Sequence, residues 1–333
     1  MKKNIYLTSL YGIKNIGGLE RVNKYIYDIL SEKYNVKILE KREKIYKHGD
    51  WLLQSLRISL KLYFIRNKFV IGTSWHSFFY PCDLTFHHGT QMGTIINLHN
   101  STKYTRRIAN MEKISAILSK KNIAVGKNVK KELIEYYNIS KNKIFVLNNF
   151  VDDSLFIPKK IQRNTNKIII LFAGSLCKRK GIDYLIQLSN FIESSNKYLL
   201  YIATNSKSNS EYFVNKKNTL IFFSLTEKEM VDFYNSGDIL FFPSLYEGFS
   251  MATLEALSCG IPVIGTKWAI MEELLTFDFV KITNIKNMEK VISDVNYLIK
   301  NFNNKKNLIH NLISTSFGKE QYKTKLLNLI EEK

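Results

Sequence analysis

Short apolar runs that resemble strands alternate with longer amphipathic helical patterns along the whole chain of 333 residues. This alternation is typical of βαβ units, in which helices cover the faces of a parallel sheet. We expect strands over 4–8, 34–39, 69–72, 84–87, 123–125, 144–147, 167–173, 198–203, 219–223, 239–243 and 262–265. The pattern therefore predicts an α/β protein.

The length fits two domains of roughly 150 residues each. The stretch 152–166 mixes a proline with lysines and asparagines, and the most apolar strand follows it. We therefore expect a first domain over 1–157, a second over 158–315 and a final helical segment over 316–333. Open parallel sheets bind ligands at the carboxyl ends of their strands, so we expect the site between the domains.

Composition excludes several classes of protein. With 45% hydrophobic residues the chain can bury two cores, and no apolar run approaches the roughly 18 residues of a membrane-spanning helix. The N-terminal apolar stretch is too brief for a signal peptide. The three cysteines, Cys82, Cys177 and Cys259, lie far apart and match no zinc pattern. We expect them to be small buried hydrophobic residues, and we expect the protein to be in the reducing cytoplasm.

The net charge of +20 is unusual, and most of it lies in the first half. Residues 1–157 hold 26 basic and 12 acidic residues, a net charge of +14. Such an excess indicates an anionic partner, whether nucleic acid, an acidic membrane face or a phosphorylated substrate. A non-enzymatic nucleic-acid binder is disfavoured because aromatics do not alternate with the basic residues and no recognition motif is present.

Three common catalytic signatures are absent from the sequence. The chain contains no GxGxxG after its first strand, no GxxxxGK[ST] and no GxSxG. We therefore do not expect NAD-dependent chemistry, a P-loop nucleotidase or a serine hydrolase of the usual α/β type.

Two glycine-containing loops precede predicted helices. Gly17 and Gly18 follow the first strand, where bare backbone can approach an anion or form a plain tight turn. In the second half a buried strand leads through Gly174 to three cations, Lys178, Arg179 and Lys180. Cations just before a helix N-terminus are repelled by the helix dipole unless an anion is bound there, so the run indicates an anion site. The alternative is that these residues form a solvated surface turn.

The most informative segment runs from 238 to 264 and predicts a strand, a turn at Glu247 and a helix over 250–258. Backbone N–H groups in the first helical turn lack intrahelical partners and can bind a phosphate. Glu255 lies deeper in this helix among apolar residues, which favours a carboxylate that accepts hydrogen bonds from sugar hydroxyls over an exposed surface acid.

These residues resemble a known family. Glu247 to Glu255 resembles the E-x7-E segment of retaining nucleotide-sugar glycosyltransferases of the GT-B fold, family 4 (glycosyl transferases group 1). The segment 17–22 is similar to the first glycine-rich loop of this family, and the segment 174–181 is similar to its phosphate loop. The segment 146–152 is similar to the interdomain entry, where the chain of a family member passes into its second domain. The resemblance implies two Rossmann-like, doubly wound domains facing across a cleft, with the last helix packing back on the first, acceptor-binding domain.

The resemblance also implies roles for matched residues. Lys180, helped by Arg179, would neutralise the donor diphosphate, and Glu255 would bind the ribose hydroxyls. Glu247 would face the donor sugar and distal phosphate together with four backbone amides, those of Gly248, Phe249, Ser250 and Met251. Either His87 or His88 would lie near the sugar, and we prefer His88 because it is nearer the strand end.

The chain departs from the family pattern at some positions. Ser175 occupies the usual place of a phosphate-binding arginine, and Asn148 and Phe150 replace a proline and a glycine at the interdomain entry. Because of the first departure, Lys180 would have to neutralise more of the negative charge of the phosphates. The second leaves the geometry of the interdomain entry open.

We expect metal-free, retaining transfer of a hexose from a nucleotide diphosphate sugar, UDP- or GDP-linked, to a glycan or lipid-linked acceptor in surface polysaccharide biosynthesis. The nucleotide sugar is the donor substrate, and no cofactor is expected. A GT-B nucleotide-sugar epimerase is the alternative within enzymes. The basic stretch 51–68 predicts a helix with Leu52, Leu56, Leu60 and Tyr63 on one stripe. That helix either lies on an anionic membrane face or covers the sheet.

Overall fold

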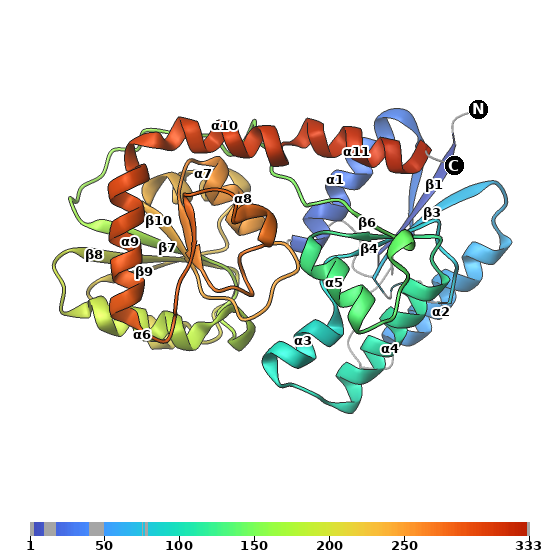
Figure 1. Cartoon of the computed structure of the whole chain (residues 1–333), viewed down its shortest axis with the longest axis horizontal. Coiled ribbons are helices and arrows are strands. Elements are labelled where there is room, and N and C mark those ends of the chain that lie inside the picture. Colours follow the sequence, from blue (N-terminus) through green and yellow to red (C-terminus); the bar gives the residue numbers. More distant parts are fainter. Residues whose placement is uncertain (1–2, 10–17, 40–49, 75, 77–78, 332–333) are drawn as a thin grey trace. The chain divides into compact units, whose positions relative to one another are not determined.

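The computed structural model describes residues 3–9, 18–39, 50–74, 76 and 79–331. The chain divides into two compact units (Figure 1). Unit 1 comprises Met1–Asn148 together with Lys323–Lys333, and unit 2 comprises Asn149–Tyr322.

Unit 1 is built on a six-stranded sheet in the order β2-β1-β3-β4-β5-β6, with every neighbouring pair parallel. The strands are β1 (Asn4–Thr8), β2 (Asn35–Leu39), β3 (Lys68–Thr73), β4 (Leu84–His87), β5 (Lys121–Ala124) and β6 (Ile144–Val146). The helices are α1 (Gly18–Lys33), α2 (Asp50–Phe64), α3 (Gln91–Leu98), α4 (Lys103–Leu118), α5 (Lys127–Glu135) and the later part of α11 (Lys319–Glu331).

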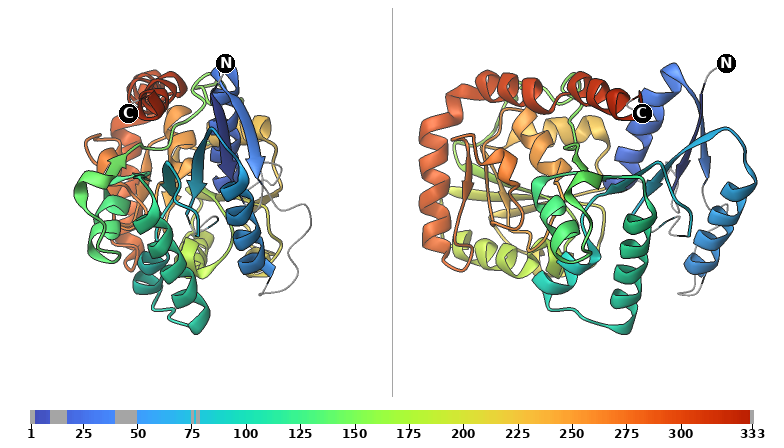
Figure 2. Two further views of the ribbon diagram at one scale, coloured as in Figure 1. Left: turned by 90° about the vertical axis from the view of Figure 1, so that its right-hand side faces the viewer. Right: turned by 45° about the vertical axis from the view of Figure 1, so that its right-hand side comes forward.

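Helices α2 and α4 pack on the same part of this sheet. Ile58 and Leu62 of α2 share one buried cluster with Ile108 and Met111 of α4 and with Val70 of β3. Both helices extend below the strands in the two views of Figure 2. Leu56, Leu60 and Tyr63, three members of the stripe noted in the sequence, are exposed and do not reach this core.

Unit 2 is a second six-stranded parallel sheet, in the order β12-β11-β10-β7-β8-β9. The strands are β7 (Ile168–Ala173), β8 (Tyr198–Thr204), β9 (Thr219–Phe223), β10 (Ile239–Phe242), β11 (Val263–Gly265) and β12 (Val280–Ile282). The helices are α6 (Ile182–Glu193), α7 (Glu227–Ser236), α8 (Met251–Ser258), α9 (Met288–Phe302), α10 (Lys306–Phe317) and the start of α11.

Helices cover both faces of the unit 2 sheet. Buried leucines and valines of α6 and α9 form one core with β7, β8 and β10, while α7 and α8 lie on the other side of the strands (Figure 1). Strand order reverses between β7 and β10, which are hydrogen-bonded neighbours. Ligands of doubly wound sheets bind at such a reversal, outside the carboxyl ends of the strands.

The expected strands agree with the observed ones to within two residues at each end, and β12 was not expected. Its three residues are too few to give a recognisable alternation. Residues 149–157, which we assigned to the first domain, lie in unit 2. They are fixed there by long-range contacts: Val151 bridges Gly318, and the Ser258 hydroxyl donates to the carbonyl of Phe156.

Candidate active site

The loop that follows β7 places three cations next to the end of β10. Lys178–Lys180 form one turn of 3-10 helix, and Gly181 ends that turn with φ of +74°. A β-carbon at Gly181 would lie 2.1 Å from the carbonyl oxygen of Pro243. Only glycine fits this combination of left-handed backbone and close approach, so Gly181 lets the two loops meet.

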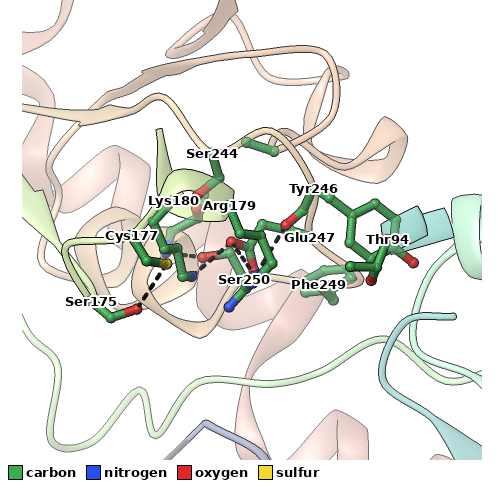
Figure 3. A network of polar contacts seen from close by, with 12 residues as sticks. Thr94, Ser175, Cys177, Arg179, Lys180, Ser244, Tyr246, Glu247, Phe249 and Ser250 are labelled. Carbon is green, nitrogen blue, oxygen red and sulfur yellow. Dashed lines mark hydrogen bonds and ion pairs between the residues drawn. The ribbon is translucent and has the colours of Figure 1, made fainter. Parts of the chain in front are cut away.

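Backbone and side-chain hydrogen bonds join the loop after β7 to the loop after β10. The N–H of Leu245 donates to the carbonyl of Arg179 over 2.8 Å, and Nη1 of Arg179 donates to the carbonyl of Tyr246 over 3.1 Å. The N–H of Glu247 donates to the carbonyl of Trp268 over 3.1 Å, which ties in the loop after β11. Figure 3 shows the side chains of Arg179 and Lys180 beside that of Glu247.

Glu247 forms ion pairs with two of the cations. Its Oε1 lies 2.7 Å from Nζ of Lys180 and 3.0 Å from Nη1 of Arg179. The side chains of Lys180 and Glu247 are only 15% and 10% exposed, whereas that of Arg179 is 38% exposed. Burial acts to raise the pKa of Glu247, but the charges of Lys180 and Arg179 outweigh it and hold that pKa below its usual value. One ionised carboxylate is thus shared by two cations.

Helix α8 begins four residues after Glu247. Ser250 is its N-cap, and its hydroxyl accepts a hydrogen bond from the N–H of Thr253 over 3.3 Å. The remaining N–H groups of the first turn, starting with Met251, have no intrahelical acceptor by geometry. The ring centroids of Phe249 and Phe317 lie 5.8 Å apart. The backbone carbonyl of Phe249 accepts a hydrogen bond from the side-chain amide of Asn149. Both Gly248 and Phe249 are buried, so the local backbone is held in place.

Glu255 is buried in α8, with 3% of its surface exposed. Its Oε2 accepts a hydrogen bond from the hydroxyl of Tyr234 over 2.9 Å. Tyr234 lies on α7 and is itself fully buried. The apolar surroundings of Glu255 were readable in the sequence, but Tyr234 was not identified because nothing in local spacing links it to α8.

The two histidines after β4 have different environments within unit 1. His87 is fully buried at the end of the strand, 2.9 Å from Asn122 Oδ1 through Nε2. His88 follows the strand, is half-buried and stacks on Phe86 with ring centroids 6.2 Å apart. Burial lowers the pKa of each histidine to about 4. Both rings are therefore neutral at pH 7, and His88 is the one with surface to offer a ligand.

A buried acid that the sequence analysis did not single out supports the segment after His88. Glu112 of α4 accepts from the backbone N–H of Gln91 over 2.7 Å and from the hydroxyls of Ser74 and Tyr137. Burial is the largest influence on Glu112 and raises its pKa, while these hydrogen bonds act in the opposite direction. The network fixes the start of α3.

Of the two glycines in the predicted first loop, Gly18 begins α1, and Gly17 lies outside the described residues.

Residues 153–315 match the family model for glycosyl transferases group 1. The similarity to this family lies wholly within unit 2. The match covers both ion-paired loops of unit 2, including Lys180, Glu247 and Glu255.

Curated proteins similar to this chain include two from bacteria. It is 31% identical over 192 residues to an uncharacterised 41.2 kDa protein in the cps region of Klebsiella pneumoniae, a match that covers 54% of this chain and 53% of that protein. It is 30% identical over 174 residues to the capsular polysaccharide biosynthesis glycosyltransferase CapM of Staphylococcus aureus, covering 47% and 46%. The matched stretch thus spans about half the length of these relatives.

Solved structures with the same fold are glycosyltransferases of GT-B type. A sucrose-phosphate synthase from Thermosynechococcus elongatus aligns over 99% of both chains with a TM-score of 0.81 and 13% identity. HepE of Anabaena, solved in complex with UDP and glucose, aligns over all of both chains with a TM-score of 0.74 and 11% identity. At such identities the agreement establishes the fold of this chain and nothing finer.

Two features are absent from the described residues. No helix in the described ranges is long and apolar enough to cross a membrane. Among the same residues no group of three or more His, Cys, Asp or Glu side chains could hold a metal ion. The prediction of metal-free chemistry remains a prediction.

Proposed function

We propose that the protein is a retaining glycosyltransferase that moves a hexose from a UDP- or GDP-linked sugar to a glycan or lipid-linked acceptor in surface polysaccharide biosynthesis. The observation that supports it best is the shared ion pair of Lys180, Arg179 and Glu247 at the reversal of the unit 2 sheet. The names of CapM and of the HepE complex with UDP and glucose agree with a nucleotide-sugar donor and a polysaccharide product.

The proposed mechanism follows from charge. Cleavage of the bond between the anomeric carbon and the β-phosphate develops negative charge on the leaving oxygen and positive charge on the sugar ring. Lys180 and the first N–H groups of α8 would bind the diphosphate, and they would stabilise its growing charge more strongly in the transition state than in the ground state. Glu255 would hold the ribose hydroxyls, and Glu247 would face the sugar.

Glu247 pairs with both Lys180 and Arg179, so its single negative charge leaves one positive charge for a diphosphate. An arriving diphosphate would therefore compete with Glu247 for Lys180, and release of the carboxylate would let it turn toward the sugar. Because the pKa of Glu247 is held low, it would act as an anion near the developing positive charge and not as a proton donor.

The proposal is tested with the purified full chain, first by thermal shift against UDP, GDP and their hexoses, then by product analysis with the donor that binds. Lys180→Ala should weaken diphosphate binding and lower kcat/KM by about 100-fold or more, the range typical of removing one electrostatic stabiliser. Lys228→Ala, which removes an exposed lysine on α7, is the matched control and should behave as wild type.

The outcomes separate the alternatives. Sugar transferred with release of the nucleoside diphosphate supports a glycosyltransferase. Isomerised donor that forms without an acceptor identifies an epimerase. Wild-type turnover in both Lys180→Ala and Glu255→Gln would contradict the assignment of the site.

A further inference from the structure

A pocket lined by cations lies in unit 2, between the segment before β7, the C-terminal end of α7 and the start of α10. Its volume is about 300 Å³. No acid is among the described residues that line it. We call it the basic pocket, and its charged and amide side chains are those of Lys159, Lys160, Arg163, Lys306, Asn235 and Asn307.

A second hollow of about 290 Å³ adjoins the basic pocket, because Lys306 and Asn307 line both. It adds the cation Lys305 and the side-chain amides of Asn303 and Asn304. Hollows of this size are at the lower end of the range for small-molecule sites. Together the two have room for a ligand with more than one charged group.

The basic pocket lies at the opposite edge of the unit 2 sheet from Lys180 and Glu247. Arg163 pairs with Asp238, the residue before β10, and Asp238 also accepts from the N–H of Ile169 at the start of β7. Lys180 and Glu247 instead follow the carboxyl ends of the same two strands. At about 3.3 Å per residue, these strands separate the two edges by roughly 13–20 Å. The basic pocket is therefore separate from the candidate active site.

Hydrogen bonds within unit 2 fix the wall of the basic pocket. The N–H of Lys159 donates to Oδ1 of Asn235 over 2.7 Å, and Nδ2 of the buried Asn235 donates to the carbonyl of Ile157 over 3.0 Å. Nη1 of Arg163 donates to both carboxylate oxygens of Asp238 over 2.8 and 2.9 Å. The lining backbone is thus held in place by the fold.

Two of the four cations of the basic pocket lack an acidic partner. Arg163 and Lys159 each pair with an aspartate, and the second of these pairs is largely exposed. Lys160 and Lys306 form no ion pair with any described residue. Two positive charges on its wall therefore remain for a ligand.

An anion would stabilise Lys306 in particular. This lysine is half-buried, and burial together with the charge of Arg163 lowers its pKa, while Asp238 acts in the opposite direction. It is the first residue of the 12-residue helix α10, whose dipole disfavours a cation there, and no described side chain caps this start. A β-carbon at Gly260 would lie 2.6 Å from Cα of Lys306, so the end of α8 holds the backbone of Lys306 in place.

We propose that the basic pocket and its adjoining hollow bind a small molecule that carries two or more phosphate groups. Lys160 and Lys306 would bind the phosphates directly, and the asparagine amides would donate to their oxygens. The positive end of α10 also favours a phosphate. The described lining has no aromatic side chain on which a base could stack, which disfavours a single-stranded nucleic acid.

This inference does not rest on the proposed function. It is tested by isothermal titration calorimetry of the full chain with inorganic pyrophosphate, in about 0.15 M salt. The titrations use Lys180→Ala, in which the donor site is weakened. Binding should persist in this variant, and orthophosphate should bind more weakly than pyrophosphate because it reaches only one of the two hollows.

Adding Lys160→Gln and Lys306→Gln to Lys180→Ala should weaken pyrophosphate binding at least about tenfold, since two charge-assisted hydrogen bonds are lost. Lys306→Arg keeps the charge and should retain binding. The matched control is Lys286→Gln with Lys300→Gln, because both lysines are exposed in unit 2 and line neither hollow.

Chemical acetylation read by mass spectrometry locates the ligand. Pyrophosphate should protect Lys160 and Lys306 from acetylation and leave Lys286 and Lys300 as reactive as before. Protection of all four lysines to the same extent would show that the anion associates with the basic surface in general, and would overturn the inference.

Three further results would overturn it. These are loss of all pyrophosphate binding in Lys180→Ala, equal binding by the glutamine pair and its matched control, and orthophosphate binding as tight as that of pyrophosphate. Binding in Lys180→Ala reports on the basic pocket, and binding in Lys160→Gln with Lys306→Gln reports on the donor site. The two proposals therefore fail in distinguishable ways.

Discussion

At the residue scale, Gly181 decides whether the loops after β7 and β10 can meet. Its φ of +74° is costly for any residue with a β-carbon, and the Pro243 carbonyl occupies the place where that carbon would lie. The cations before it and Glu247 come together only because this contact is allowed. The sequence marked Lys180 as unusual, because a cation before a helix opposes the helix dipole. It did not show that Glu247 is the ion-pair partner of Lys180.

We predict that Gly181→Ala destabilises unit 2 by at least about 2 kcal/mol, the sum of left-handed strain and backbone displacement. Gly18→Ala is the control, because a β-carbon there meets no atom of the described residues within 4 Å and helical alanine is favourable. Urea unfolding monitored by circular dichroism measures both. A loss in Gly181→Ala no larger than that in Gly18→Ala would contradict this account of the loop contact.

At the element scale, α11 shows how a helix is anchored by packing more than by charge. Its residues from Lys323 onward belong to unit 1, where Leu326 and Ile330 are buried. Lys323 pairs with Glu32, and Glu331 accepts from Lys33 and Tyr34 of the same unit. Surface pairs of this kind contribute about 0–1 kcal/mol, whereas a buried leucine contributes several times more.

We therefore predict that Leu326→Ala lowers the stability of unit 1 by about 2–5 kcal/mol, while Lys323→Ala lowers it by at most about 1 kcal/mol. Native-state hydrogen exchange at the amides of β1 and β3 reports this stability. Equal effects of the two substitutions would show that the ion pair, and not the buried leucine, anchors the helix.

At the scale of the whole molecule, unit 1 contains buried ionisable groups whose pKa shifts couple its stability to pH. Burial lowers the pKa of His76 to about 3 and that of His87 to about 4. In the unfolded chain both take up protons near pH 6.5. Protons thus bind the unfolded state preferentially, so this stability is present above pH 6.5 and is lost as the pH falls toward 4.

We predict that the free energy of unfolding of unit 1 falls between pH 6.5 and pH 4, by up to about 1.4 kcal/mol per pH unit for each of the two histidines. Glu112 acts oppositely, because its raised pKa gives stability that is lost as the pH rises. Urea unfolding at several pH values, compared between wild type and His76→Gln with His87→Gln, isolates the histidine contribution. Equal slopes in the two proteins would contradict it.

The sequence by itself determined the α/β class, the position of most strands and the burial of Glu255, because alternation and apolar surroundings are local properties of the chain. It also indicated Lys180 and Glu247 as candidate site residues, because a run of cations and an acid each stand just before a predicted helix. Only the tertiary structure decided that both cations share one oxygen of Glu247, that Tyr234 holds Glu255, and that residues 149–157 lie in unit 2. It also decided which stripe of α2 is buried, since that depends on the neighbouring strands and helix and not on helical spacing alone.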